Sequence, residues 1–160
     1  AFINNLFGIH IIPTLIVNIS LFPISYVLLN SVIYFNLLIF ASIFSTAAIY
    51  LEYIADKQMK VFRSNDENYG KTMQKGLWKY SRHPNYLGEI LFWVGVYLFG
   101  VSSGVTPITI LICPLLMLAL FMFISCPMMD DRSIKKRSDY KDYMNKTSQL
   151  LLWPPKKRIG

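Results

Sequence analysis

The sequence predicts an all-α integral membrane protein: a helical bundle with about four transmembrane helices, cytoplasmic connecting segments and a C-terminal tail. The distribution of charge is the first observation behind this prediction, because residues 1–51 and 90–129 contain no Asp, Glu, Lys or Arg. All sixteen basic and nine acidic residues of the 160-residue chain lie in the blocks 52–89 and 130–160. The second observation is length. A membrane-spanning helix requires about 20 residues, so each uncharged run accommodates two such helices.

Within each uncharged run, a short polar sequence marks the turn between two helices. Asn30-Ser31 divides the first run and Ser102-Ser103-Gly104 divides the second. Pro13 and Pro23 are expected to kink the first helix, which a membrane helix tolerates. Basic residues mark the cytoplasmic side of a membrane, so we expect both charged blocks to be cytoplasmic. The four predicted spans are residues 9–29, 32–51, 85–101 and 105–126, in a single membrane domain over residues 1–160.

The net charge of +7 has a topological explanation, because the basic residues adjoin predicted spans where they meet anionic lipid headgroups. We therefore expect membrane lipids as partners, and no nucleic acid. Cys113 and Cys126 lie in one apolar run, and the two histidines, His10 and His83, lie on different segments. These residues do not form a ligand set with metal-binding spacing, so no metal site is predicted.

The first candidate site lies where the second predicted span extends into the charged block as a helix over residues 51–63. At about 100° per residue, Glu52, Asp56 and Arg63 lie within about 40° of one another on this helix. A stripe of this kind is either a solvated helix face with an ordinary ion pair or a polar wall that holds a ligand. Its proximity to the bilayer favours the second interpretation, because ionisable groups are costly there unless they are paired or used.

Residues 76–89, with the sequence GLWKYSRHPNYLGE, form the densest motif. Pro84 suits the first turn of a helix, which makes His83 its expected cap residue. The first turn of a helix presents free N–H groups and the positive end of the helix dipole. With Arg82 and His83 beside it, this terminus is expected to bind an anion such as a phosphate.

Asn85 and Glu89 are four residues apart and therefore share one helix face. Glu89 precedes forty uncharged residues, so we expect it just inside the bilayer, either paired with Arg82 or bound to a ligand. The alternative interpretation of this motif is an aromatic belt at the membrane surface, made of Trp78, Tyr80 and Tyr86. A belt would explain the aromatic residues but not the Asn85/Glu89 pair.

After the last predicted span, residues 130–143 carry many charges and few apolar residues. Read as a helix, this segment lacks a strong apolar face. It is either a charged helix at the membrane surface or a second polar wall that faces the first cluster.

These motifs resemble the membrane steroid 5-alpha-reductase-like family, within the wider isoprenylcysteine methyltransferase-like superfamily. The resemblance centres on residues 76–89 and is supported by Glu52, Asp56 and Arg63 upstream. Downstream it includes Asp139-Tyr140-Lys141-Asp142-Tyr143 and Trp153-Pro154-Pro155. It covers about residues 45–156 and is closest to the bacterial branch. It implies the C-terminal part of a longer family member, located in a bacterial cell membrane.

Enzymes of this family reduce carbon–carbon double bonds of steroids or sterols with NADPH. The resemblance therefore implies a membrane oxidoreductase that acts on a lipid-like small molecule, and it assigns no catalytic acid to this chain. The chain has no glycine-rich strand–helix fingerprint, so NADPH would not be bound in the Rossmann manner. The implied cofactor-binding residues are Glu52, Asp56, Arg63, Arg82, His83, Asn85, Tyr86, Glu89, Arg132 and Tyr143.

Two other functions remain open at this point. Methyltransferases of the same superfamily share the Arg-His-Pro-x-Tyr-x-Gly core and use S-adenosylmethionine on a lipid or an isoprenylated thiol. Asn85, the Gly88-Glu89 pair and the Glu52/Asp56/Arg63 stripe resemble the reductases more closely. The remaining alternative is a membrane fragment that keeps the fold without catalytic activity.

Overall fold

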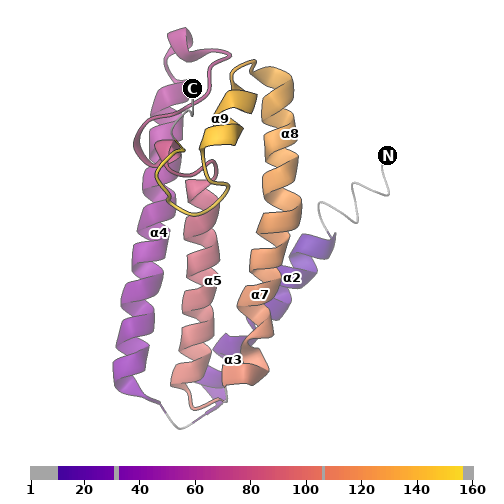
Figure 1. Ribbon diagram of the computed structural model, residues 1–160. Helices are drawn as coiled ribbons and strands as arrows, with labels where there is room; N and C mark the ends of the chain where they lie inside the picture. Colours follow the sequence, from indigo (N-terminus) through magenta and orange to yellow (C-terminus); the bar gives the residue numbers. More distant parts are fainter. Residues whose placement is uncertain (1–10, 31–32, 106, 157–160) are drawn as a thin grey trace. The chain divides into compact units, whose positions relative to one another are not determined.

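The computed structural model describes residues 11–30, 33–105 and 107–156 (Figure 1). Within these ranges the chain forms helices and no strand, apart from one isolated parallel bridge between Ser81 and Ser148. The α-helices are α2 (Ile12–Ser20), α3 (Phe22–Leu29), α4 (Phe35–Arg63), α5 (Pro84–Ser102), α6 (Pro107–Ile110), α7 (Ile112–Leu120), α8 (Cys126–Lys136) and α9 (Tyr140–Lys146). Two short 3-10 helices, η2 (Asp66–Asn68) and η3 (Gly76–Lys79), follow α4, and one π-helical segment, η4 (Phe121–Ser125), precedes α8.

The predicted all-α membrane fold is confirmed. Within the described part of the chain, four helical segments are long and apolar enough to cross a membrane: Ile12–Leu29, Phe35–Arg63, Pro84–Ser102 and Pro107–Lys136. The second ends at Arg63, which confirms the helical extension predicted over residues 51–63. The fourth continues past the predicted end at 126, because a helix satisfies its own backbone hydrogen bonds on either side of a membrane surface. Residues 9, 10, 32 and 106 of the predicted spans, among them His10, lie outside the described residues.

The first membrane segment is interrupted at Leu21, between α2 and α3. Pro23 follows this break in the first turn of α3, where its missing N–H costs no helical hydrogen bond. Pro13 lies in the first turn of α2, and the residues before Ile11, which a kink there would involve, lie outside the described residues, so the kink at Pro13 stays a prediction.

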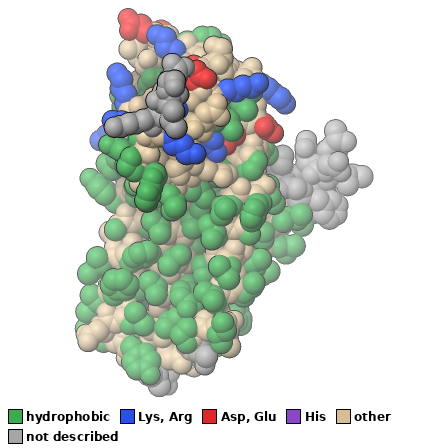
Figure 2. All heavy atoms as spheres, in the orientation of Figure 1, with side chains coloured by type: hydrophobic (Ala, Val, Ile, Leu, Met, Phe, Trp, Pro, Cys, Tyr) green, Lys and Arg blue, Asp and Glu red, His purple; other side chains and the backbone are tan. Residues whose placement is uncertain are grey.

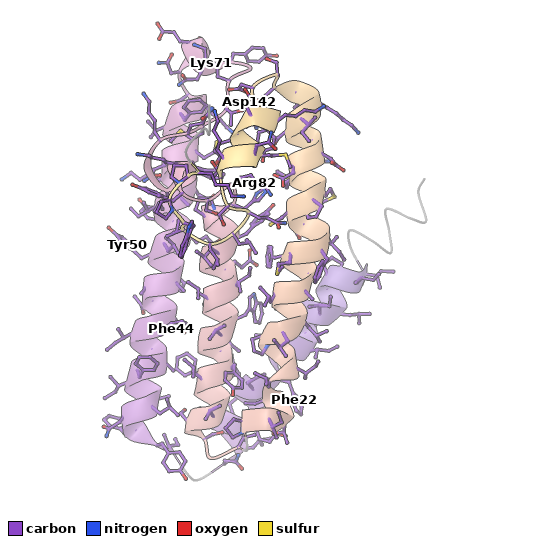
Figure 3. The ribbon with its side chains drawn as sticks, in the orientation of Figure 1. Phe22, Phe44, Tyr50, Lys71, Arg82 and Asp142 are labelled. Atoms are coloured by element: carbon purple, nitrogen blue, oxygen red, sulfur yellow. The ribbon has the colours of Figure 1, made fainter. Side chains whose placement is uncertain are left out.

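The contacts of the chain divide it into two units. Unit 1 comprises residues 1–47 and 90–121, and its sequence contains no charged residue. Many of its apolar side chains are exposed, including Leu28, Phe35 and Ile108, and Figure 2 shows hydrophobic side chains on the visible surface. Phe22, which is labelled in Figure 3, is another exposed apolar side chain of unit 1. Exposed apolar surface of this extent is typical of contact with membrane lipid.

Small residues allow helices to approach closely inside unit 1. A Cβ atom at Gly95 would lie only 2.0 Å from the Ser45 Oγ. The Ser20 hydroxyl donates to the Cys113 carbonyl oxygen over 3.1 Å. Membrane helices associate through such small-residue contacts and through hydrogen bonds between helices.

Unit 2 comprises residues 48–89 and 122–160 and contains every charged residue of the sequence. A Cβ at Gly88 would lie 2.7 Å from the Glu52 backbone nitrogen and 2.9 Å from the Ala48 carbonyl oxygen. Only glycine allows α5 to approach α4 so closely at this point. The interior of the unit includes a cluster of Met59, Met73 and Trp78.

Candidate functional site

The segment between α4 and α5 is fixed by side chains from elsewhere in unit 2. Gly76 has a positive φ of 58° and lies against Gln58, whose Oε1 accepts a hydrogen bond from the Leu77 backbone N–H over 2.9 Å. The Asp139 carboxylate accepts two bonds from Thr72, over 3.0 Å from its N–H and 2.6 Å from its hydroxyl. The segment is therefore held in one conformation against α4 and the start of α9.

Trp78 lies in η3 and is 8% exposed. Its indole Nε1 donates to the Ala55 carbonyl oxygen over 3.0 Å. The alternative interpretation of Trp78 as part of an aromatic belt at the membrane surface is wrong, because the side chain packs in the interior of unit 2. Its position fixes η3 against α4.

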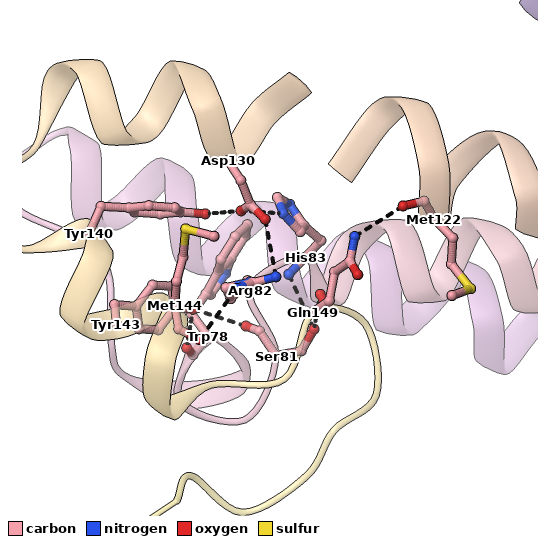
Figure 4. A network of polar contacts seen from close by, with 10 residues as sticks. All are labelled: Trp78, Ser81, Arg82, His83, Met122, Asp130, Tyr140, Tyr143, Met144 and Gln149. Carbon is pink, nitrogen blue, oxygen red and sulfur yellow. Dashed lines mark hydrogen bonds and ion pairs between the residues drawn. The ribbon is translucent and has the colours of Figure 1, made fainter. Parts of the chain in front are cut away.

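The Asp130 carboxylate of α8 binds three side chains inside unit 2 (Figure 4). One oxygen lies 3.1 Å from Arg82 Nη2, and the other lies 2.9 Å from His83 Nε2. The Tyr140 hydroxyl donates to Asp130 over 2.5 Å. Asp130 is only 4% exposed, so its charge is compensated by these neighbours and not by water. Arg82 and His83, for which the motif predicts a bound anion, thus both contact a carboxylate of the protein itself.

The C-terminal part of the chain completes this arrangement. The Tyr143 hydroxyl donates to the carbonyl oxygens of Trp78 and Ser81, over 2.5 and 3.0 Å. The Arg82 backbone N–H donates to the Ser148 carbonyl oxygen over 2.8 Å, and Arg82 Nη1 donates to Met144. The chain after α8 therefore holds the residues that lead into α5.

A cavity of about 180 Å³, here called the first cavity, lies among these elements of unit 2. Seven of the ten implied cofactor-binding residues line it: Asp56, Arg63, Arg82, His83, Asn85, Tyr86 and Tyr143. Residues of α8 and α9 line it as well, including Ser133 and Tyr140. The sequence left open whether residues 130–143 form a second polar wall that faces the first cluster. In the structure, residues of this segment line the same cavity as Asp56 and Arg63.

Glu52, Glu89 and Arg132 do not line the first cavity. Glu52 lies where α4 meets Gly88, and it interacts electrostatically with Glu89 and Asp56. Arg132 and Glu89 both interact electrostatically with Tyr86, whose ring stacks on His83 with 5.3 Å between ring centres. These three residues therefore surround the cavity wall without forming it.

Two buried polar atoms at the cavity have no hydrogen-bond partner among the described residues. The Asn85 Oδ1 and Arg82 Nε atoms are buried and form no hydrogen bond with any described residue. Neither Arg63 nor Arg137 forms an ion pair within the described ranges. Buried polar groups are normally hydrogen-bonded, so the two buried atoms, Asn85 Oδ1 and Arg82 Nε, indicate a polar ligand. Groups of three or more His, Cys, Asp or Glu that could hold a metal ion are not found among the described residues.

The donor set matches the requirements of a phosphorylated nucleotide cofactor. Guanidinium groups bind phosphate oxygens in a bidentate manner, and the Asp56 carboxylate can accept hydrogen bonds from ribose hydroxyls. The orphaned Asn85 Oδ1 can accept a further N–H or O–H from a ligand. A nucleotide cofactor therefore fits the residues that are present.

Sequence reasoning missed Asp130, Tyr140 and Arg137 as site residues. Asp130 is the first charged residue after the uncharged residues 90–129, just as Glu89 is the last charged residue before them. The criterion that singled out Glu89 therefore applies equally to Asp130. Tyr140 belongs to a motif that the sequence analysis quoted without giving it a role. No comparable feature of the sequence distinguishes Arg137 from its basic neighbours Lys135 and Lys136.

Alkaline pH is expected to destabilise the protein through its buried tyrosines. Burial raises the pKa of Tyr140 above its ordinary value, and its hydrogen bond to the Asp130 carboxylate raises this pKa further. Burial also raises the pKa of Tyr143. In the unfolded chain both phenols ionise near about pH 10, so the folded state binds more protons above that pH. The contribution of these tyrosines is therefore complete below about pH 10 and is lost as the pH rises further.

Thermal melting of the detergent-solubilised protein across this range, together with phenolate absorbance, measures the effect. The Tyr140→Phe variant should lose less stability than the wild type over the alkaline range, and its phenolate absorbance should be reduced only at the most alkaline pH. Parallel losses of stability in the two proteins would contradict this explanation.

Comparison with known proteins yields one family. The family described as Protein of unknown function (DUF1295) matches residues 1–147. No curated protein and no solved structure matches the chain significantly.

Proposed function

The chain belongs to the DUF1295 family, and from the site described above we propose that it is a membrane-bound oxidoreductase of the steroid 5-alpha-reductase-like kind. In this proposal it reduces a carbon–carbon double bond of a steroid-like or other lipid substrate with NADPH. The substrate reaches the site from the membrane, whose lipids contact the exposed apolar helices. The charged segments of unit 2 face the cytoplasm, where NADPH is available.

The observation that carries the proposal is the unpartnered polar lining of the first cavity. Asn85 Oδ1 is buried there without a hydrogen-bond partner among the described residues. Asp56 and Arg63 line the same cavity. Leaving a buried polar group unsatisfied costs about 1–3 kcal/mol, so a ligand that satisfies Asn85 is stabilised by a comparable amount.

The role of each residue follows from its chemistry. Arg63 and Arg137 bind phosphate, and Asp56 accepts hydrogen bonds from ribose hydroxyls. Asn85 orients the ligand from the first turn of α5. Trp78 and Tyr86 form walls that exclude water from the reacting atoms. NADPH, when bound, supplies the hydride that adds to one carbon of the double bond, while a proton adds to the other.

The proposal predicts that purified protein in detergent binds NADPH and that Asn85→Ala weakens this binding about tenfold or more. The reason is that the variant removes a buried group whose hydrogen bond to the ligand has no substitute, and a tenfold change corresponds to about 1.4 kcal/mol. Tryptophan fluorescence or calorimetry measures the dissociation constant. Asn145→Ala is the matched control, because Asn145 is exposed on α9 and does not line the first cavity.

The same titration with S-adenosylmethionine tests the methyltransferase alternative. That alternative has its own support in Arg82, His83, Pro84, Tyr86 and Gly88, which form the core shared with those enzymes. Preferential binding of S-adenosylmethionine, lost in Asn85→Ala, would replace the reductase proposal. If folded protein binds neither compound, the non-catalytic alternative is favoured instead.

A further inference from the structure

A second cavity of about 270 Å³ adjoins the first cavity within unit 2. The two share Met59, Arg63 and Arg137 as lining residues. The second cavity extends from this shared wall over the segment that follows α4, including Asn68, Tyr69 and Gly70. A ligand longer than either cavity could therefore occupy both, with the two arginines at the junction.

The second cavity carries an excess of positive charge. Arg63, Lys71 and Arg137 line it, against a single carboxylate from Asp66. None of these four residues forms an ion pair with any residue in the described part of the chain. Like charges that share a cavity repel one another, so this arrangement favours a bound anion over an empty site.

Two of these cations are attached to well-fixed parts of the fold. The Arg137 guanidinium lies 5.6 Å from the centre of the Tyr140 ring, and Tyr140 is itself buried and bonded to Asp130. Lys71 directly precedes Thr72, which is bound twice by Asp139. The Arg137 guanidinium is thus positioned before the ligand arrives and loses less conformational entropy on binding, whereas the Lys71 side chain is exposed and only the chain beside it is held.

We propose that the second cavity binds a phosphate monoester, held by Arg63, Lys71 and Arg137. A phosphate monoester carries a charge of about −1.5 to −2 at neutral pH, which matches three cations opposed by one carboxylate. Guanidinium groups provide the fork geometry that phosphate oxygens accept. If the proposed function is correct, on which this part rests, the monoester is the one that distinguishes NADPH from NADH, and the cavity selects between these cofactors.

The test compares the dissociation constants of NADPH and NADH for the wild type and for the variants Arg137→Gln and Lys71→Gln. The wild type should prefer NADPH. Lys71→Gln should reduce this preference about tenfold while NADH affinity stays unchanged, and Arg137→Gln, which also alters the first cavity, should weaken NADPH binding more than NADH binding. Lys141→Gln is the matched control, because Lys141 is exposed on α9 and lines neither cavity. Equal weakening of both nucleotides, or an unchanged preference in both variants, would overturn the proposal.

Two smaller probes separate the failure of this inference from the failure of the proposed function. Adenosine 2′-phosphate should bind the wild type and bind Arg137→Gln more weakly, whereas adenosine should not distinguish the two proteins. If adenosine 2′-phosphate binds in this way but neither NADPH nor NADH binds, the phosphate site is supported and the proposed reductase function is rejected. Short-chain phosphatidic acid tests a lipid headgroup as the source. Binding of phosphatidic acid that depends on Arg137 and Lys71, without binding of adenosine 2′-phosphate, would overturn the assignment to the cofactor.

Discussion

Replacing Asp130 with asparagine is expected to lower the free energy of unfolding by about 3–5 kcal/mol, the usual cost of breaking a buried ion pair by removing one partner. Asparagine has nearly the same shape, so the effect is chiefly electrostatic. The Arg82 guanidinium, 3.1 Å from Asp130, would remain buried without its counter-charge. The amide would also leave fewer acceptors for the Tyr140 hydroxyl and the His83 ring nitrogen. Thermal melting of the detergent-solubilised protein measures the loss.

Asp131→Asn is a close control, because it makes the same chemical change one residue further along α8 at an exposed position. The double variant Asp130→Asn/Arg82→Gln adds a second comparison. If the ion pair is the cause, this double variant should be destabilised by less than the sum of the single changes, because it leaves no uncompensated charge. Asp130→Asn melting at the same temperature as Asp131→Asn would rule out the explanation.

Replacing Trp78 with alanine is expected to cost about 3–5 kcal/mol, as is usual when a large aromatic side chain is removed from an interior. Trp78 packs with Met59 and Met73 and donates its indole N–H to Ala55. Its loss would leave a void next to the first cavity and free η3 from α4. Trp78→Phe should cost less, because it restores most of the packing and loses chiefly one hydrogen bond of about 1 kcal/mol.

Trp153→Ala provides the comparison for this prediction, since Trp153 is 68% exposed in the same unit. It should change the melting temperature little. Because Trp78 also lines the first cavity, Trp78→Phe should weaken NADPH binding even where the protein stays folded. Equal melting temperatures for Trp78→Ala and Trp153→Ala would show that Trp78 does not stabilise the fold.

The fold could be predicted largely from the placement of charge. Two uncharged runs, each with a polar turn near its middle, are sufficient to predict four membrane helices, and Pro84 correctly marks the start of α5. The end of the fourth helix could not be placed in the same way, whereas the second ends at Arg63, as the extension predicted over residues 51–63 requires. Hydropathy changes at the membrane surface, but a helix ends only where its backbone bonding is interrupted. No glycine or proline interrupts residues 51–63.

The site could be predicted only in part, because local motifs do not identify distant partners. Residues 76–89 pointed to Arg82, His83 and Asn85, and the structure places all three at one cavity. The partner of Arg82 lies 48 residues away on α8, and no spacing within either segment encodes that contact. Tyr143 was implied as a cofactor ligand by the resemblance, yet its hydroxyl donates to two backbone carbonyls. Such assignments depend on tertiary packing, which the sequence pattern does not display.

The bridge between Ser81 and Ser148 has a consequence for synthesis. Residues 80–82 receive their backbone partners from residues 148–153, through Arg82 to Ser148 and Trp153 to Tyr80. At about 5–20 residues per second, the ribosome needs roughly 3–13 s to make the residues between these segments. By the end of that time every predicted span has been translated. The backbone of residues 80–82 therefore gains these partners only after the last predicted span has been made, and a nascent chain stalled before residue 148 would lack them.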